Sequence, residues 1–200
     1  MAFNADQFRS VLVDDGARPN LFEVELGFPS YVQNVASLAR FMVKTAQLPG
    51  STLGSVPLQY FGREVKVAGN RTFADWTVTI INDENFAIRN AMDAWMRGIN
   101  NNTSNLRDNR ARNTASGGGL LGNTGGYASD ATVTQYRKTG GTAKKYRFVG
   151  MFPIDITPID LDWGSNDTVE EFSVTFQYQY WVDVNTASGF TGTSLFTTSA

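Results

Sequence analysis

The chain has 200 residues, of which 42% are hydrophobic and 18% charged, so it is long and apolar enough for one domain with its own core and is not a disordered polymer. It contains neither histidine nor cysteine, which excludes disulfides, the usual zinc sites and Cys–His nucleophilic catalysis. The net charge is −2, but residues 101–150 carry eight basic and two acidic side chains, whereas residues 151–200 carry seven acidic and no basic ones.

The first quarter of the chain predicts an arm, two strands and a loop. Residues 1–19 have weak periodicity and read as an N-terminal arm. In residues 20–27, Phe, Val and Leu alternate with Glu, which is typical of a half-buried strand. Residues 28–37 are loop-like, and we expect residues 40–50 to form a second strand that ends at Pro49-Gly50.

The next segment predicts a hairpin and a further strand. Residues 56–69 hold two short apolar runs on either side of Gly62, the pattern of a β-hairpin. Residues 73–81 alternate as a strand. Its apolar side carries Trp76, Val78 and Ile80.

Residues 82–100 predict the one convincing helix, because the apolar period changes from two to helical spacing. Asn82 or Asp83 can accept the first free amide protons, and Gly98 with the following Asn run is expected to end the helix. A row of Arg89, Asp93 and Arg97 can pair along another face. The apolar stripe comprises Ile88, Met92, Trp95 and Ile99.

The second half of the chain predicts a long loop, a hairpin and two more strands. Residues 100–130 are rich in Asn, Ser, Thr and Gly and predict a long loop insertion, and residues 131–150 predict a hairpin turning at 139–141. Residues 152–163 read as a strand broken or bulged around Pro158, and the tail at 185–200 is expected to be flexible.

Residues 169–181 predict one long strand of about twelve residues, roughly 40 Å at about 3.3 Å per residue. Apolar side chains occupy every second position, and the face between them carries Ser173, Thr175, Gln177 and Gln179. The whole chain therefore predicts a single domain over residues 1–200. Its expected fold is mainly β, an antiparallel β-sandwich or barrel with one flanking α-helix.

Motifs for catalysis, metal or nucleotide binding are weak, so we expect no enzyme and no cofactor. A G-x-G-x-x-G spacing at Gly117, Gly119 and Gly122 lies in the long loop, without the strand and helix that the dinucleotide motif needs. The acids Asp155, Asp160 and Asp162 lack the spacing of a calcium loop. Arg107, Arg110 and Arg112 have no interleaved aromatic residue, as a nucleic-acid patch would.

Localisation follows from the apolar runs and the first residues. No run approaches the roughly 18–20 residues of a membrane span, so we expect no membrane. The opening MAFNADQFRS lacks the features of a secretory signal, and we expect synthesis in a reducing cytoplasm.

Four stretches stand out in chain order: ARPNLFEVEL (17–26), TAQLPG (45–50), VAGNRTFADWTVTIINDE (67–84) and LDWGSNDTVEEFSVTF (161–176). Together they resemble the tail tube proteins of T4-like contractile-tailed bacteriophages. The resemblance implies a phage tail-tube fold, related to that of the type VI secretion tube. It also implies a structural subunit that forms homohexameric rings, which stack head to tail into a tube that conducts DNA during ejection.

The same resemblance implies a virion location, in the tail tube, and a set of partners. These are further copies of the chain, the tail sheath protein, baseplate and tail terminator proteins, and a tape-measure protein and genomic DNA in the lumen without sequence-specific binding. We expect Gln177 and Gln179 to face the lumen, because uncharged polar groups let a polyanion slide whereas basic ones hold it. We expect Pro49, Gly50 and Gly54, in a loop at 48–62, to contact the next ring together with the N-terminal arm.

Several alternatives stay open. The charge blocks can meet between rings, or lie on neighbouring strands that neutralise each other within one subunit. A baseplate-end tube initiator or a type VI secretion-like tube subunit would have a similar sequence pattern. A β-sandwich module that binds a ligand would be monomeric and would form no filaments.

Overall fold

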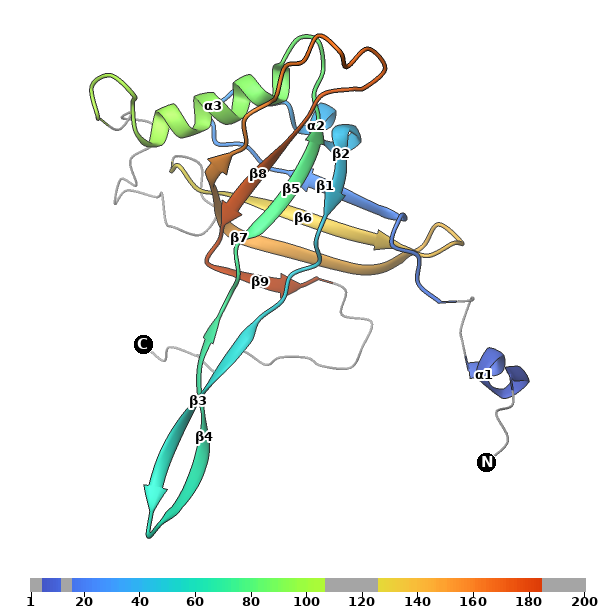
Figure 1. Ribbon diagram of the computed structural model, residues 1–200, viewed down its shortest axis with the longest axis vertical. Helices are drawn as coiled ribbons and strands as arrows, with labels where there is room; N and C mark the ends of the chain where they lie inside the picture. The colour runs from blue at the N-terminus through green and yellow to red at the C-terminus, as the bar shows by residue number, and fades with distance from the viewer. Residues whose placement is uncertain (1–4, 12–15, 107–125, 185–200) are drawn as a thin grey trace, which may run out of the picture.

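The long strand β7 organises the fold, because its two halves belong to two different sheets (Figure 1). The computed structural model describes residues 5–11, 16–106 and 126–184. The helices are α1 (Ala5–Val11), α2 (Ala36–Met42) and α3 (Ala87–Ile99). The strands are β1 (Phe22–Leu26), β2 (Val43–Ala46), β3 (Thr52–Tyr60), β4 (Arg63–Thr72), β5 (Trp76–Ile81), β6 (Ser129–Tyr136), β7 (Thr142–Ile156), β8 (Glu171–Gln177) and β9 (Tyr180–Asp183).

All strand pairs are antiparallel. The first sheet has the order β1-β6-β7-β9, and the second continues from the far half of β7 as β7-β8-β5-β2. The remaining pair, β3 and β4, forms a separate two-stranded hairpin. The expected antiparallel, mainly β fold with a flanking helix is thereby confirmed.

The core lies where the two sheets face each other and α3 closes over them. The indole of Trp76 on β5 stacks on the ring of Phe148 on β7, with centroids 4.3 Å apart. From α3, Trp95 reaches the ring of Phe176 on β8 at 6.2 Å. The expected apolar sides of β5 and α3 are buried as predicted, with Ile99 only partly so. The largest fully buried side chains include Trp76, Trp95, Phe148, Phe172, Phe176, Leu26, Ile80, Ile88 and Met92.

The helix α3 differs from its prediction at both ends. It begins at Ala87, whose amide donates to the Asp83 carboxylate at 3.0 Å, so Asp83 caps the turn as expected. The Asn82 side chain instead donates to Glu170. Gly98 does not end the helix but lies buried within it, and Arg89 donates to the carbonyl of Thr157 rather than joining a row with Asp93.

The strand predicted at 40–50 was wrong in its first part. Residues Ala36–Met42 form the helix α2, and only Val43–Ala46 form a strand. The predicted broken strand at 152–163 is also shorter, since β7 continues to Ile156 with a register shift between Pro153 and Asp155. Residues 157–170 then form an irregular loop.

The single long strand predicted through residue 181 was wrong. β8 ends at Gln177, the chain breaks at Tyr178 and Gln179, and β9 begins at Tyr180. β8 pairs with the second half of β7, whereas β9 pairs with the first half in the other sheet. The alternation persists across the break because Tyr178 still packs toward the core, with its ring 4.9 Å from that of Phe148.

The hairpins predicted at 56–69 and 131–150 are confirmed, and both are longer than expected. Of the predicted arm, residues Ala5–Val11 form the short helix α1. The tail at 185–200 and residues 107–125 of the predicted long loop lie outside the described residues, as do Arg107, Arg110, Arg112 and the three loop glycines.

Candidate assembly surfaces

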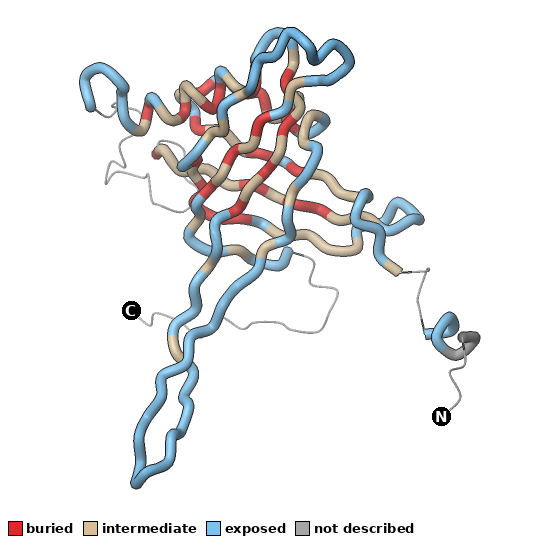
Figure 2. The backbone as a smooth tube through the Cα atoms, in the orientation of Figure 1, coloured by how far each residue is buried: buried red, intermediate tan, exposed pale blue. Residues whose placement is uncertain are grey.

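The hairpin of β3 and β4 projects away from the two packed sheets as a narrow ribbon (Figure 1). Nearly every residue in it is exposed, in contrast to the buried centre of the domain (Figure 2). An isolated two-stranded ribbon is marginally stable in water, because it lacks a layer against which to bury a face. A ribbon of this length therefore requires a partner outside its own chain to become rigid.

Local sequence accounts for the ribbon's shape. Phe61 and Gly62 form the two-residue turn, with φ of 44° and 78°, and positive φ at both central residues is the pattern of the tight turns that match strand twist. Farther from the tip the register shifts between Leu53 and Ser55. There a Cβ on Gly69 would lie 3.2 Å from the Gly54 carbonyl, so the two backbones approach closely.

One face of this ribbon is largely apolar, and Arg63, the partner of Tyr60, is the charged residue on it next to the tip. The register pairs Val56 with Val67 and Leu58 with Val65, and Tyr60 continues the same face. The opposite face is polar, with pairs such as Gln59 and Glu64. The five apolar side chains are between 46% and 68% exposed, and Phe61 at the tip is 93% exposed. Such a contiguous exposed apolar surface marks a contact site for another protein.

The residues predicted to contact a neighbouring ring lie at the base of this ribbon. Pro49 and Gly50 precede β3, and the Gly50 carbonyl accepts a hydrogen bond from the Trp181 indole at 3.1 Å. Gly54 lies within β3, so the segment predicted as a loop at 48–62 is largely strand. Sequence reasoning missed the apolar face itself, although the alternation of Val, Leu and Tyr in β3 and of Val in β4 was visible.

A second candidate surface is the outer face of the sheet that contains β5 and β8. Its side chains are hydroxyls that pair across the strands: Thr77 with Thr175 at 3.2 Å and Thr79 with Ser173 at 3.1 Å. We call these four residues the hydroxyl face. They point away from the core because their neighbours along each strand are the buried ones.

Gln177 and Gln179 are both exposed, but they do not share one strand. Gln177 ends β8 and continues the row of Ser173 and Thr175. Gln179 lies in the break, where its backbone amide donates to the carbonyl of Val149 at 3.0 Å. The structure therefore places Gln177 beside the hydroxyl face and Gln179 at the crossing between the two sheets.

Three strands end their sheets: β1 and β9 border the first sheet, and β2 borders the second. An edge strand presents unpaired backbone N–H and C=O groups, which are templates for pairing with another chain. β9 is only four residues long, and its side chains Tyr180, Val182 and Val184 beyond its end are more than a third exposed. These edges are candidates for lateral contacts between copies.

Within the described part of the subunit, an ion pair joins the two charge blocks. Lys144 on β7 donates to the carboxylate of Asp183 on β9, and this hydrogen bond raises the pKa of Lys144. Two other described ion pairs do not join the two blocks. Arg147 contacts Asp130, and both belong to residues 101–150, whereas Glu171 contacts Lys44 on β2. The remaining acids of 155–167 are exposed, so neutralisation between strands accounts for only part of the asymmetry.

Among residues 5–11, 16–106 and 126–184, no group of three or more acidic side chains lies close enough to hold a metal ion. The acids Asp155, Asp160 and Asp162 are each exposed. No helix in that same part of the chain has the length and hydropathy needed to cross a bilayer.

Comparison with known proteins gives a consistent family match. A family model described as "Phage tail tube protein" matches residues 17–184. The chain is 32% identical over 183 residues to the tail tube protein gp19 of Enterobacteria phage T4, covering 90% of this chain and 99% of that protein. It is 24% identical over 177 residues to the tail tube protein of Serratia phage KSP90, covering 86% of this chain and 93% of that protein.

Solved structures share the fold at low sequence identity. A chain in the sheath–tube complex of the PVC extracellular contractile injection system aligns with a TM-score of 0.55 and 13% identity, covering 91% of this chain and 98% of that chain. A chain in the baseplate of the anti-feeding prophage aligns with a TM-score of 0.56 and 14% identity, covering 84% and 95% respectively.

Proposed function

The chain belongs to the phage tail tube protein family and is a structural tube subunit of a contractile phage tail, and from that premise we propose how it assembles. Six copies close into a ring through their sheet edges, and rings stack head to tail into a hollow tube. Open-ended stacking requires a heterologous interface, in which two different surfaces of the same molecule meet.

The observation that carries this proposal is the apolar face of the β3–β4 ribbon. Its five apolar side chains lie on one face of an element that projects from the body and contacts little of its own chain. A second copy in the next ring would cover this face and bury it. Gly54 in the ribbon, and Pro49 and Gly50 just before it, then lie at the base of the contact between rings.

Electron microscopy of the purified protein at rising concentration tests the proposal, since it predicts tubes of stacked rings. The variant Leu58→Thr/Val65→Thr keeps β-propensity while removing apolar surface. Each substitution is expected to lose about 1 kcal/mol of contact energy, since the side chains are already half exposed. Two of them would raise the concentration needed for assembly roughly 30-fold.

The matched control is Ser55→Thr/Gln59→Thr, which changes two exposed residues on the opposite face of the ribbon. We expect this variant to assemble like the unaltered protein, and both variants to have its melting temperature as monomers. A Leu58→Thr/Val65→Thr protein that forms tubes at the same concentration would contradict the role proposed for the ribbon.

For the bore we propose the hydroxyl face, with Gln177 beside it and Gln179 at its margin. The paired hydroxyls of Thr77, Thr79, Ser173 and Thr175 present no charge to a passing phosphate backbone. A basic wall would bind phosphates and release counterions, which slows movement of DNA. This surface therefore suits a channel through which DNA passes during ejection without sequence-specific contact.

The partners that we propose follow from the assemblies in which similar folds occur. The solved neighbours come from a sheath–tube complex, a baseplate and tube-terminating caps of contractile injection systems. We propose that this tube likewise contacts a tail sheath, a baseplate and a terminator, and encloses a tape-measure protein and DNA. The role is non-enzymatic, and the chain's lack of His and Cys supports that reading.

A baseplate-end ring remains the second candidate, since one structural neighbour is a baseplate chain. Copy number in purified particles separates the two roles. A tube subunit is present in many rings, whereas an initiator forms one ring only.

A further inference from the structure

The crossover between β8 and β9 lies at the root of the β3–β4 ribbon, where the two legs of the ribbon leave the sheets (Figure 1). The incoming leg is residues 47–51, between β2 and β3, and the outgoing leg is residues 73–75, between β4 and β5. The crossover is residues 178–179. Three segments that are far apart in the sequence therefore meet at one place.

An aromatic side chain from each side of the crossover holds one leg. Trp181, on β9, donates its indole N–H to the carbonyl of Gly50 in the incoming leg at 3.1 Å. Tyr178, just before β9, packs its ring against that of Phe73 in the outgoing leg, with centroids 6.0 Å apart. Burial raises the pKa of Tyr178, and the charge of Asp75 raises it further, which agrees with a position against the outgoing leg.

Both aromatic residues are also anchored on one strand of the body. The Tyr178 ring meets Phe148 edge to face at 4.9 Å, and the Trp181 ring meets Tyr146 edge to face at 5.4 Å. Tyr146 and Phe148 lie two positions apart on β7 and therefore share one face of that strand. The legs of the ribbon are thus tied to β7, the strand that joins the two sheets.

The ribbon depends on such ties for its direction. Beyond the legs it is exposed along nearly its whole length (Figure 2). A two-stranded ribbon has no second layer to pack on, and it rotates about its two chain connections unless side chains hold them. Contacts at the root therefore have a large effect on where the tip lies.

The same contacts also hold β9. This edge strand is only four residues long and pairs with β7 on one side. The bond from Trp181 to Gly50 and the ion pair of Lys144 with Asp183 add to that pairing. Because so short a strand has few ladder hydrogen bonds, the loss of a side-chain contact changes how often it opens.

We propose that Tyr178 and Trp181 form a clamp that fixes the direction of the ribbon and couples it to the edge strand β9. Opening of β9 frees the incoming leg, and movement of the outgoing leg loosens β9. Such coupling is reciprocal, so a contact made at β9 also stabilises the ribbon in its clamped direction. Its consequence in a tube rests on the proposed function: a neighbour that pairs with β9 within the ring holds the ribbon in one direction.

A distance measurement on the monomer tests the clamp without any tube. Because the chain has no cysteine, the variant Lys66→Cys/Asn90→Cys carries spin labels only on the ribbon and on the exposed side of α3. Pulsed electron spin resonance is expected to give one narrow distance distribution. Adding Trp181→Phe keeps a ring beside Tyr146 but removes the donor to Gly50, and it should widen the distribution at least about twofold.

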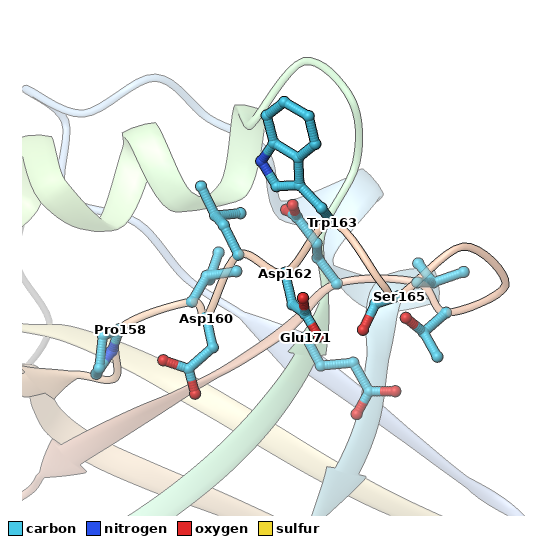
Figure 3. A pocket seen from close by; sticks show the side chains of 11 residues that line it. Pro158, Asp160, Asp162, Trp163, Ser165 and Glu171 are labelled. Atoms are coloured by element: carbon cyan, nitrogen blue, oxygen red, sulfur yellow. The ribbon is translucent and has the colours of Figure 1, made fainter.

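Trp163→Phe is the matched control, because Trp163 is 101% exposed and its indole projects outward from the loop at 157–170 (Figure 3). It should leave the distribution narrow. An unchanged distribution in Trp181→Phe, or equal widening in both variants, would overturn the proposal even where tubes form normally. If the clamp passes this test and the unaltered protein forms no tubes, the proposed function fails and the clamp stands.

Hydrogen exchange measures the coupling from the other leg. Phe73→Ala removes the ring on which Tyr178 packs, although Phe73 lies outside β9. The amides of Tyr180–Asp183 are expected to exchange at least about threefold faster in this variant, because residues of one contact network are coupled. Phe61→Ala, at the exposed tip of the ribbon, should leave them unchanged.

The amides of β5 and β8 report the stability of the whole domain in the same experiment. The proposal requires that they keep their exchange rates while those of β9 rise. Unchanged exchange of β9 in Phe73→Ala, or an equal acceleration that includes β5 and β8, would show that the ribbon and β9 are not coupled through the clamp.

Discussion

Gly98 in the last turn of α3 shows how one residue without a side chain can position a loop. A Cβ at this position would lie 2.2 Å from Cε2 of Tyr31, whose hydroxyl donates to the Trp95 carbonyl at 3.1 Å. The Tyr31 ring therefore packs directly on the helix backbone. The glycine is required by this close approach and not by helix termination, because Ile99 continues the helix.

Gly98→Ala is expected to destabilise the monomer by up to about 2 kcal/mol. Helix propensity alone would favour Ala by about 1 kcal/mol, but overpacking against Tyr31 costs about 1–3 kcal/mol and more than offsets that gain in this tight contact. Urea unfolding of the monomer measures the change. Gly141→Ala is the control, since nothing lies within 4 Å of its Cβ position. A Gly98→Ala protein about 1 kcal/mol more stable than the unaltered chain would show that Tyr31 moves without cost.

At the scale of single residues, alternation predicted which side chains are buried but not which polar groups pair. Trp76, Val78 and Ile80 are buried as the period of two requires. The partners of Asn82 and Arg89 were not predictable, because each bonds to a residue more than 60 positions away. Helical spacing placed Arg89 beside Asp93, and it could not show that the Thr157 carbonyl was nearer.

At the scale of elements, the periodic pattern reports which way side chains face and not which strand is the neighbour. The alternation from Phe172 to Tyr180 crosses a break in which the chain leaves one sheet and joins the other. In the same way, α2 was missed because seven residues span barely two turns and their apolar residues fit a strand equally well. Both errors concern partners and lengths, which depend on tertiary contacts.

For the candidate surfaces too, the sequence predicted the direction of side chains but not their contacts. The uncharged polar row of Ser173, Thr175 and Gln177 was visible in the sequence and lies on one sheet face, where Ser173 and Thr175 are half-buried and Gln177 is exposed. The ribbon was predicted as a hairpin, but the chain alone could not reveal that its apolar face finds no partner. The acidic loop around Trp163 was predicted as part of a strand, so its exposure emerged only with the fold.

Hydrogen exchange should distinguish the ribbon from the rest of the monomer. The backbone amides of β3 and β4 are expected to exchange quickly in monomers, because a two-stranded ribbon without a covering layer opens easily. In assembled tubes the same amides should become protected. Peptides from β5 and β8 are the internal control and should be protected in both states. Equal exchange of the ribbon in monomers and tubes would mean that it does not dock.

At the scale of the whole molecule, the opposite ends carry opposite charge, and this arrangement predicts a salt-sensitive assembly. The ribbon at one end has three basic side chains and one acidic one, whereas the loop at 157–170 at the other end has acidic residues and no basic one (Figure 1). Screening shortens from about 10 Å at 0.1 M to about 3 Å at 1 M salt, so exposed charges across a joint lose most of their attraction. The concentration needed for tube formation should therefore rise with salt, and rise less steeply for Arg63→Glu/Lys66→Glu. Light scattering at several salt concentrations measures how the concentration needed for tube formation changes with salt for each protein. If the concentration needed for tube formation falls as salt increases, apolar contacts alone hold the rings together.

Because the hydroxyl face is uncharged, we expect the bore not to retain DNA, and adding positive charge to this face should change that. Thr77→Lys/Thr175→Lys would add twelve positive charges to each proposed ring of six, and phosphates bound there would displace counterions. Tubes of this variant, assembled with short DNA fragments, should retain nuclease-protected DNA at low salt and release it as salt rises. Asn90→Lys, on the exposed side of α3, should leave any bound DNA open to nuclease. Equal protection in the two variants would place the hydroxyl face outside the bore.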